Sequence, residues 1–411
     1  MARLLKLALP TQVSVPADST NRFADDPNAA ALGKKLFFDS RFSGPLLDEA
    51  NTGQASTLGM VGDTGRVACA GCHVPANGRF DDNRTARGQL SLGAGWTHRR
   101  TPQLLDVGQA SLLAWDGRRT TSYSVVFAVI ESPLEFNSSR LFVAQQIAAL
   151  YKSEYEAIFG PLPALDQFPV LAAADAGCTK LPSDPTTQGC PKPGADDEAV
   201  TRVVANMGKA ISAYNRLLTC GESRFDKWIR GDAAALTPEE QAGARLFVGK
   251  AACDGCHSGP YFTDQKFHNV GAQGSLVPFT GVDTRNDPGA ATGLAHAHDD
   301  WLGPQGPFSD GDDGRLDQIP QDLSKLEGAF RTPGLRCMEN RKSFMHNGEY
   351  RSLENVMELL DAGQGHSGFV GTPETAPLGL TVEEKAQLVA FMLSLQGPGP
   401  DQSLRDPPTL P

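Results

Sequence analysis

The chain has 411 residues and a formal net charge of −11, with 40% hydrophobic and 21% charged residues. This composition is typical of a globular protein long enough for two modest domains. The acidic balance argues against non-specific binding to nucleic acid, and no apolar run reaches the roughly 20 residues of a transmembrane helix. The 43 glycines and 29 prolines predict short helices separated by long irregular segments.

The N-terminal region leads into the first predicted helix. Residues 1–10 contain basic residues and leucines, but their apolar stretch is too short for a convincing signal peptide, and no cleavage site follows it. Asp26 and Pro27 then open a helix that reaches Phe38. The following residues, 44–67, are rich in turn-forming residues and predict a loop.

Two copies of one short motif carry most of the chemical information. The sequence C-A-G-C-H at 69–73 recurs as C-D-G-C-H at 253–257. This pattern is typical of c-type haem attachment, in which each cysteine bonds one vinyl group and the adjoining imidazole becomes the fifth iron ligand. The residues concerned are Cys69, Cys72, His73, Cys253, Cys256 and His257. A zinc ribbon needs cysteine pairs about 15–20 residues apart. The two pairs in this chain are separated by a far longer stretch of sequence, so we predict two covalent haems and not a zinc site.

The other four cysteines leave two interpretations open. Cys178 and Cys190 bracket a Pro/Thr/Gly loop that a disulfide can close, and Cys220 with Cys337 is the second possible pair. The alternative is four free, buried thiols. Covalent haem attachment and disulfides both indicate an oxidising compartment, so we expect a periplasmic protein.

Longer helices are expected between and after the two motifs. Apolar residues repeat near a 3.6-residue period over 139–159 and again over 196–219. Capping boxes at 237–240 and 381–384 open two more helices, one just before the second motif and one near the C-terminus. Helix, loop and haem motif therefore form an internal repeat. Residues 270–325 predict a long Gly/Asp/Pro-rich loop.

Several segments between and around these elements match one family in order and spacing. They are L-G-K-K-L-F-F-D-S-R-F-S-G (32–44), A-W-D-G-R-R (114–119), S-P-L-E-F (132–136), F-R-T-P-G-L-R (330–336) and F-M-H-N-G-E-Y-R-S-L-E-N-V (344–356). With the two haem motifs, they make residues 30–396 resemble the bacterial di-haem cytochrome c peroxidase/MauG family.

The resemblance implies a mainly α fold of two cytochrome c-like haem domains, with long irregular loops and little β structure. The expected domains are an N-terminal peroxidatic haem domain (23–215) and a C-terminal electron-transfer haem domain (216–398). Residues 399–411 are expected to form a flexible tail.

The resemblance also assigns roles to individual residues. His73 corresponds to the ligand of the peroxidatic haem and His257 to that of the electron-transfer haem. Trp115 matches the tryptophan between the two haems, where an indole can relay an electron. Glu135 matches the acid above the peroxidatic haem, which can take a proton from bound hydrogen peroxide and return it to the leaving oxygen.

Two departures from the family concern the remaining iron ligands. Gln89 lies near the position of the histidine that caps the first haem in peroxidases, so that haem is expected to be open, as in MauG-like members. At the second haem, Leu360 replaces the family's methionine or tyrosine and cannot bind iron. Met357, one helical turn earlier, and His366, in a Gly-rich loop, are the two possible sixth ligands.

A third departure concerns the interdomain calcium site of the family. Arg100 stands where the family has an asparagine ligand, and the carbonyl donors correspond to residues 341–343, which begin with Arg341. Calcium binds oxygen ligands, and two cations at this place would repel it. Bound calcium is therefore not expected.

The resemblance implies a hydrogen peroxide-dependent di-haem oxidoreductase of the MauG-like branch. Such an enzyme oxidises an external substrate, here expected to be an aromatic side chain of a protein, through high-valent haem iron. One alternative is a cytochrome c peroxidase that removes peroxide with electrons from a small cytochrome or cupredoxin. An alternative of another class is a di-haem electron carrier without catalysis of its own.

Overall fold

The computed structural model describes residues 1–54, 57–81, 90–181, 197–277, 280–363 and 369–411. The helices among these residues are α1 (Ala2–Leu5), α2 (Pro27–Phe38), α3 (Cys69–Cys72), α4 (Ser122–Glu131), α5 (Arg140–Leu150), α6 (Lys152–Phe159), α7 (Glu198–Asn215), α8 (Arg224–Ile229), α9 (Pro238–Val248), α10 (Ala290–His298), α11 (Leu353–Ala362), α12 (Val382–Leu393) and α13 (Gln402–Arg405). The described strands, β1 (Phe267–His268) and β2 (Phe330–Arg331), form one antiparallel pair. The expected mainly helical fold with little sheet is confirmed.

The first half of the molecule is built on the crossing of α2 and α7. The side chain of Asp26 accepts hydrogen bonds from the N–H groups of Asn28 and Ala29, which caps α2. At the crossing, a Cβ on Gly33 would lie 1.9 Å from the carbonyl oxygen of Ala210. Only glycine therefore lets the two helices approach so closely.

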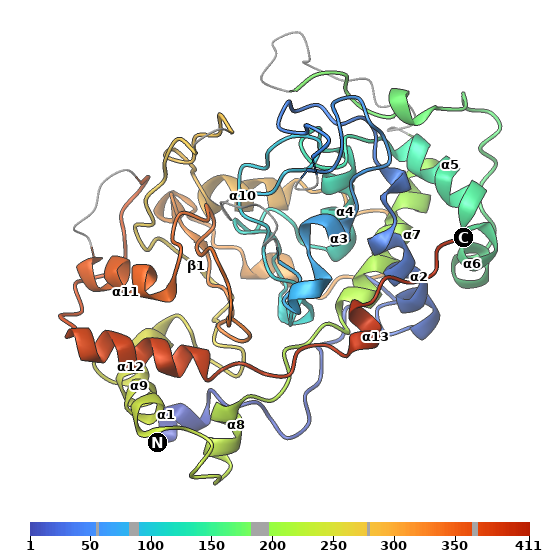
Figure 1. Ribbon diagram of the computed structural model, residues 1–411. Coiled ribbons are helices and arrows are strands. Elements are labelled where there is room, and N and C mark those ends of the chain that lie inside the picture. Colours follow the sequence, from blue (N-terminus) through green and yellow to red (C-terminus); the bar gives the residue numbers. More distant parts are fainter. Residues whose placement is uncertain (55–56, 82–89, 182–196, 278–279, 364–368) are drawn as a thin grey trace.

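The second half repeats this arrangement with α9 and α12. Both helices begin with the predicted capping boxes, in which Thr237 and Thr381 exchange hydrogen bonds with the glutamates three residues later. Gly243 lies where α9 meets α12, and a Cβ there would be 1.9 Å from the carbonyl oxygen of Gln387. In Figure 1 the α2–α7 and α9–α12 pairs lie on opposite sides of the molecule.

Each helix pair has its own apolar core, and an aromatic triad lies in each. Phe37 of α2 packs against Phe80 and against Tyr214 of α7. In the second half, Phe247 of α9 packs against Phe262 and Phe391, with ring centroids 5.7 and 5.2 Å apart. The sequence repeat is therefore also a repeat of packing.

Both ends of the chain cross between the halves. Leu4 and Leu7, close to the N-terminus, are buried in the second core. The C-terminal residues run from α12 back to the first half (Figure 1). There the carbonyl oxygens of Ser403 and Leu404 accept hydrogen bonds from Lys34 of α2 and Tyr214 of α7. The prediction of a flexible tail is therefore wrong, because this segment contains α13 and packs on the first half. Its hydrogen bonds are made by main-chain carbonyl groups, which the amino-acid composition does not show.

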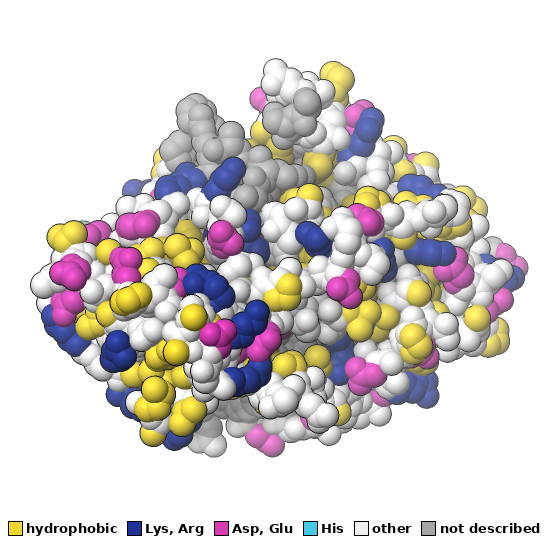
Figure 2. Space-filling model, turned by 60° about the horizontal axis from the view of Figure 1, so that its bottom comes forward, with side chains coloured by type: hydrophobic (Ala, Val, Ile, Leu, Met, Phe, Trp, Pro, Cys, Tyr) yellow, Lys and Arg dark blue, Asp and Glu magenta, His cyan; other side chains and the backbone are white. Residues whose placement is uncertain are grey.

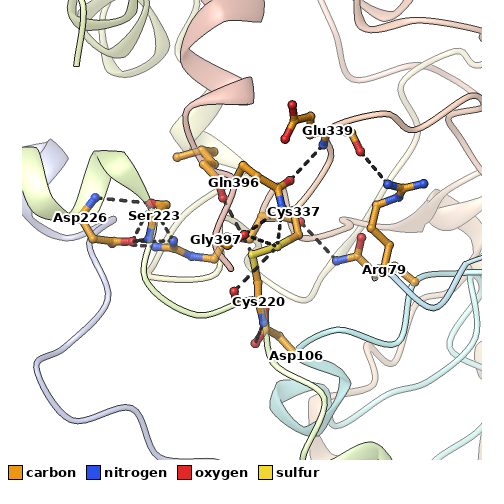
Figure 3. Close-up of a disulfide and its surroundings, with 12 residues drawn as sticks. Arg79, Asp106, Cys220, Ser223, Asp226, Cys337, Glu339, Gln396 and Gly397 are labelled. Carbon is orange, nitrogen blue, oxygen red and sulfur yellow. Dashed lines mark hydrogen bonds and ion pairs between the residues drawn. A yellow bond between two sulfur atoms is a disulfide. The ribbon is translucent and has the colours of Figure 1, made fainter. Parts of the chain in front are cut away.

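A disulfide lies just beyond the end of α7, where the chain leaves the first half. Cys220, after α7, is bonded to Cys337, and both residues are buried (Figure 3). This confirms the second of the pairs considered from the sequence. Cys178 is also disulfide-bonded, whereas Cys190, its expected partner, lies outside the described residues.

Two helix predictions need correction. The single helix expected over 139–159 is interrupted at Tyr151, whose φ of −126° and ψ of 13° are not helical. The hydroxyl of Tyr151 donates a 2.8 Å hydrogen bond to the buried carboxylate of Asp39, which holds the residue in place. The loop expected over 270–325 contains α10, because Ala290, Leu294 and Ala297 line one buried helix face within a Gly/Asp-rich sequence.

No helix in the described part of the chain combines the length and the apolar character that a membrane crossing requires.

The glycine crossings can be tested by substitution. Gly243→Ala should lower the free energy of unfolding by about 1–3 kcal/mol, because the methyl group meets rigid backbone of α12. At an exposed position inside a helix, the same substitution raises the free energy of unfolding by about 1 kcal/mol, so the expected effect at Gly243 has the opposite sign. Denaturant unfolding would measure the change, with Arg245→Ala at an exposed position of α9 as the control. An unchanged or raised stability would contradict the close crossing.

Candidate functional site

Each C-x-x-C-H motif folds into one helical turn. The first forms α3, and the second forms a 3₁₀ turn over Cys253–Gly255. The N–H groups of His73 and His257 donate to the carbonyl oxygens of Cys69 and Cys253, at 2.8 and 2.9 Å. Because residues three apart on a helical turn share a face, this turn brings both cysteines to the same side, with the histidine next to them.

Both histidines are oriented by the same hydrogen bond. Nδ1 of His73 lies 3.0 Å from the carbonyl oxygen of Phe80, and Nδ1 of His257 lies 2.9 Å from that of Phe262. A carbonyl oxygen can only accept, so the proton is on Nδ1 and the lone pair is on Nε2. Burial lowers the pKa of His257, which favours the neutral form that binds metals. Iron-ligating histidines in proteins are commonly held in this way.

The acceptor residues have an uncommon backbone conformation. Phe80 and Phe262 have φ angles of 55° and 56°, and both are fully buried. A bulky residue in the left-handed region costs about 1–3 kcal/mol and persists only where its surroundings fix it. Neither phenylalanine was predicted from the sequence to have a functional role. The available signal was a phenylalanine shortly after each motif, in R-F-D at 79–81 and Y-F-T-D at 261–264.

Trp115 lies between segments of both halves. Its indole N–H donates a 2.7 Å hydrogen bond to the carbonyl oxygen of Arg100. Its own carbonyl oxygen accepts, also at 2.7 Å, from the N–H of Arg331 on β2. The residue is 9% exposed. The first half therefore holds the ring of Trp115, and the second half holds its backbone.

Glu135 lies near the first motif. The pKa of the Cys69 thiol is raised to about 12, chiefly by burial, then by the charge of Cys72, and also by the charge of Glu135. Burial raises the pKa of Glu135 itself, although a hydrogen bond from Ser132 and the charges of Arg118 and Arg119 oppose this. The structure thus places a carboxyl group with a raised pKa beside the first motif.

A cavity next to Trp115 is lined by cations. Its walls include Trp115, Tyr261, Gln103, Arg100, Arg331 and Arg341. Arg331 makes no ion pair with the described residues, and burial lowers the pKa of its guanidinium to about 10. An unpaired cation in a cavity is costly, and the carboxylate side chains of a porphyrin are groups that it can pair with. The residues present therefore fit a bound haem.

The candidate sixth ligands of the second haem occupy different environments. Met357 on α11 is 4% exposed and belongs to the second apolar core, whereas Leu360 is partly exposed. His366 lies outside the described residues, as does Gln89 in the first half. His98, the other histidine near the first site, is exposed.

The position expected for calcium is occupied by paired arginines. The guanidinium of Arg100 donates to Oγ of Ser343 at 2.8 Å and to Oδ2 of Asp81 at 2.6 Å. Nε of Arg341 lies 3.3 Å from the same carboxylate oxygen. Burial lowers the pKa of Arg341 to about 9, and the charge of Arg100 adds to this effect.

Several known proteins are similar to this chain over most of its length. The model of the di-haem cytochrome c peroxidase family matches residues 27–234. The cytochrome-c peroxidase IdrP1 of Denitromonas iodatirespirans is 29% identical over 406 residues, which cover 94% of this chain and 87% of that protein. The methylamine utilization protein MauG of Methylorubrum extorquens is 27% identical over 386 residues, covering 93% and 82%.

Solved structures show the same fold. The diheme peroxidase BthA from Burkholderia thailandensis has a TM-score of 0.63 and 20% identity, with 98% of both chains covered. A MauG-like protein associated with microbial copper homeostasis has a TM-score of 0.60 and 22% identity, with 97% of both chains covered.

We predict that the protein does not require calcium. After washing with chelator and removal of the chelate, elemental analysis should find no stoichiometric calcium, because Arg100 and Arg341 place positive charge where the metal would bind. Added calcium should leave the Tm unchanged for the same reason. Calcium that survives the wash at one ion per chain would show that the site is elsewhere or that the arginines move.

Proposed function

The chain belongs to the di-haem cytochrome c peroxidase family, and on this premise we propose a peroxide-dependent oxidation of an external substrate. The family consists of di-haem peroxidases and MauG-type oxidoreductases, so the protein is an enzyme of this class. Its relatives include both cytochrome c peroxidases and MauG proteins. We propose the MauG-like alternative, in which the substrate is an aromatic side chain of another protein.

The observation that carries the proposal is the position of Glu135 beside the first motif. Its charge acts on Cys69, and burial raises the pKa of its carboxyl group. A carboxyl group with a raised pKa is a stronger base than an ordinary glutamate, and it can accept a proton and return it during a reaction. We assign it to take the proton from peroxide and deliver it to the leaving oxygen.

The cofactor assignment follows the two motifs. Cys69 and Cys72 would bind one haem covalently, with His73 as axial ligand, and Cys253, Cys256 and His257 would bind the other. Bound haem supplies redox-active iron that reacts with peroxide. The chain contributes the orientation of each imidazole through Phe80 and Phe262 and a cation, Arg331, for a propionate.

Trp115 is proposed to pass electrons between the two haem sites. Its hydrogen bonds to Arg100 and Arg331 come from segments on either side of the predicted domain boundary. We accordingly propose two haem domains, 23–215 and 216–398, each built around one apolar core and one motif. The separate aromatic triads at Phe37 and Phe247 support this division.

The partner is proposed to be a protein that meets the enzyme outside the cytoplasm. The disulfide Cys220–Cys337 and covalent haem attachment both fit an oxidising compartment such as the periplasm. Figure 2 shows acidic and basic side chains intermixed on one face of the molecule, with apolar groups between them. Such a mixed surface suits a partner recognised by local charge pairs rather than by one large field of a single sign.

A spectrum of the haem-loaded enzyme tests the proposal. The oxidised protein should contain one open, high-spin haem, and one equivalent of hydrogen peroxide should change the bands of both haems together. Two six-coordinate haems that do not respond to peroxide would indicate an electron carrier. Turnover with a reduced small cytochrome many times faster than with any protein substrate would favour the cytochrome c peroxidase alternative.

Glu135→Gln should slow the reaction with peroxide by about 10²- to 10⁴-fold, the usual contribution of general acid–base catalysis. In the unaltered enzyme the rate should rise with pH through the pKa of Glu135, which lies above the ordinary glutamate value, because only the carboxylate accepts a proton. The variant should lose this dependence. Stopped-flow measurements across pH provide both values, with Glu154→Gln at a surface ion pair as the control. A variant that retains the full rate would remove Glu135 from the mechanism.

A further inference from the structure

One buried carboxylate is shared by three arginines from both halves. Asp81 contacts Nη2 of Arg100 at 2.6 Å, Nε of Arg341 at 3.3 Å and Nε of Arg79 at 3.4 Å. The side chains of all four residues are at most 7% exposed. Asp81, Arg79 and Arg100 belong to the first half and Arg341 to the second, so the carboxylate lies at the junction of the halves.

The arginines extend this junction to further groups. Arg79 donates a 2.6 Å hydrogen bond to the carbonyl oxygen of Glu339, as Figure 3 shows. Arg100 donates to Ser343 at 2.8 Å, and Arg341 donates to the side-chain oxygen of Gln103. All three arginines therefore form a hydrogen bond with a residue of the other half, and all three are held in place by Asp81.

Asp81 directly follows Phe80, whose carbonyl oxygen accepts the hydrogen bond from the His73 imidazole. The side chain of Asn77 donates to Oδ1 of Asp81 at 2.9 Å and to its carbonyl oxygen at 2.7 Å. The side-chain oxygen of Asn77 in turn accepts from the N–H of Phe80 at 3.1 Å. The same short turn therefore fixes the Asp81 carboxylate and the carbonyl group that orients His73.

The other side of the cluster reaches Trp115. Asp81 holds the guanidinium of Arg100, and the carbonyl oxygen of Arg100 accepts a hydrogen bond from the indole N–H of Trp115. The backbone N–H of Arg100 donates at 2.7 Å to the carbonyl oxygen of His346 in the second half. The position of the indole ring therefore depends on the placement of Arg100.

Charge makes this arrangement sensitive to the single acid. Three guanidinium groups surround one carboxylate, and removal of one partner from a buried ion pair is strongly destabilising because the remaining charge is left uncompensated. Without the carboxylate, Arg79, Arg100 and Arg341 repel one another in a medium that screens charge weakly. The cluster would then relax by moving apart, and Arg100 would carry Trp115 with it.

We propose that Asp81 is a positioning residue that holds Trp115 in register with the two haem sites, through the three arginines that it binds. The inference rests on the proposed function, since it concerns the rate at which electrons pass between those sites. Asp81 is assigned no contact with peroxide or haem. Its effect is on the distance and orientation of the relay.

The test compares Asp81→Asn with the unaltered haem-loaded protein. After rapid mixing with one equivalent of peroxide, the appearance of the spectral change at the second haem should be slowed by about 10- to 100-fold, the scale of a displacement of about 1 Å. Disappearance of peroxide at the first haem and the haem content should change much less. Trp115→Phe should slow the same step.

A matched control separates positioning from general destabilisation. Asp39 is equally buried at 1% exposure and is bound by Arg41 and Tyr151 within the first half. Asp39→Asn should therefore lower stability and leave the transfer rate unchanged. The double variant Asp81→Asn/Arg341→Gln restores the net charge of the cluster, and we expect it to recover stability without recovering the transfer rate.

The possible outcomes are distinct. If Asp81→Asn transfers as fast as the unaltered protein while Trp115→Phe is slow, Asp81 does not position the relay. If the double variant recovers both stability and rate, the effect is one of charge alone and the proposal is also wrong. If the unaltered protein shows no response of the second haem to peroxide, the proposed function itself fails. Should Asp81→Asn not fold, the double variant and Arg100→Lys measure the same rate, and Arg100→Lys is expected to slow it because lysine cannot bind Asp81 and Ser343 together.

Discussion

The hydrogen bond from a histidine Nδ1 to the carbonyl group of a buried phenylalanine is the constraint on which the rest of the structure depends. It occurs at Phe80 and at Phe262, each in a left-handed conformation that would be unfavourable if unsupported. The support comes from the aromatic triads, and these require α2 to cross α7 and α9 to cross α12 closely. The glycines at the two crossings meet that requirement. Helix packing and imidazole orientation are therefore parts of one arrangement.

The two halves are connected by bonds of different kinds, and Trp115 lies among them. The disulfide Cys220–Cys337 fixes the exit of α7 to the segment after Arg336, and Arg336 is itself paired with the buried Asp226. The C-terminal residues return to α2 and α7 through main-chain hydrogen bonds. These contacts limit the movement of the halves as whole bodies. The ionic cluster at Asp81 acts more locally, on the residue to which the indole is bonded.

The sequence predicted the elements whose signals are local. Capping residues and apolar periodicity located α2, α7, α9 and α12, because a helix end is determined by a few neighbouring residues. It missed the interruption at Tyr151, since that depends on the distant Asp39. The haem motifs were evident from spacing alone. The acceptor carbonyls of Phe80 and Phe262 were not, since a backbone group leaves no mark in residue identity. Asp81 was missed because its importance arises only when residues 79, 100 and 341 meet.

The two halves have the same helix arrangement but differ in the charged groups beside each motif. This difference supports the different roles proposed for the two haem sites. Beside the first motif, burial raises the pKa of Glu135, so that its carboxyl group can exchange a proton. Beside the second, His268 lies between Asp264 and Glu374 at 3.0 and 2.7 Å, and Asp254 within the motif is paired with Arg3. Groups held in ion pairs keep their charge while an electron arrives or leaves. A site that exchanges protons suits peroxide chemistry, and one with fixed charges suits electron transfer.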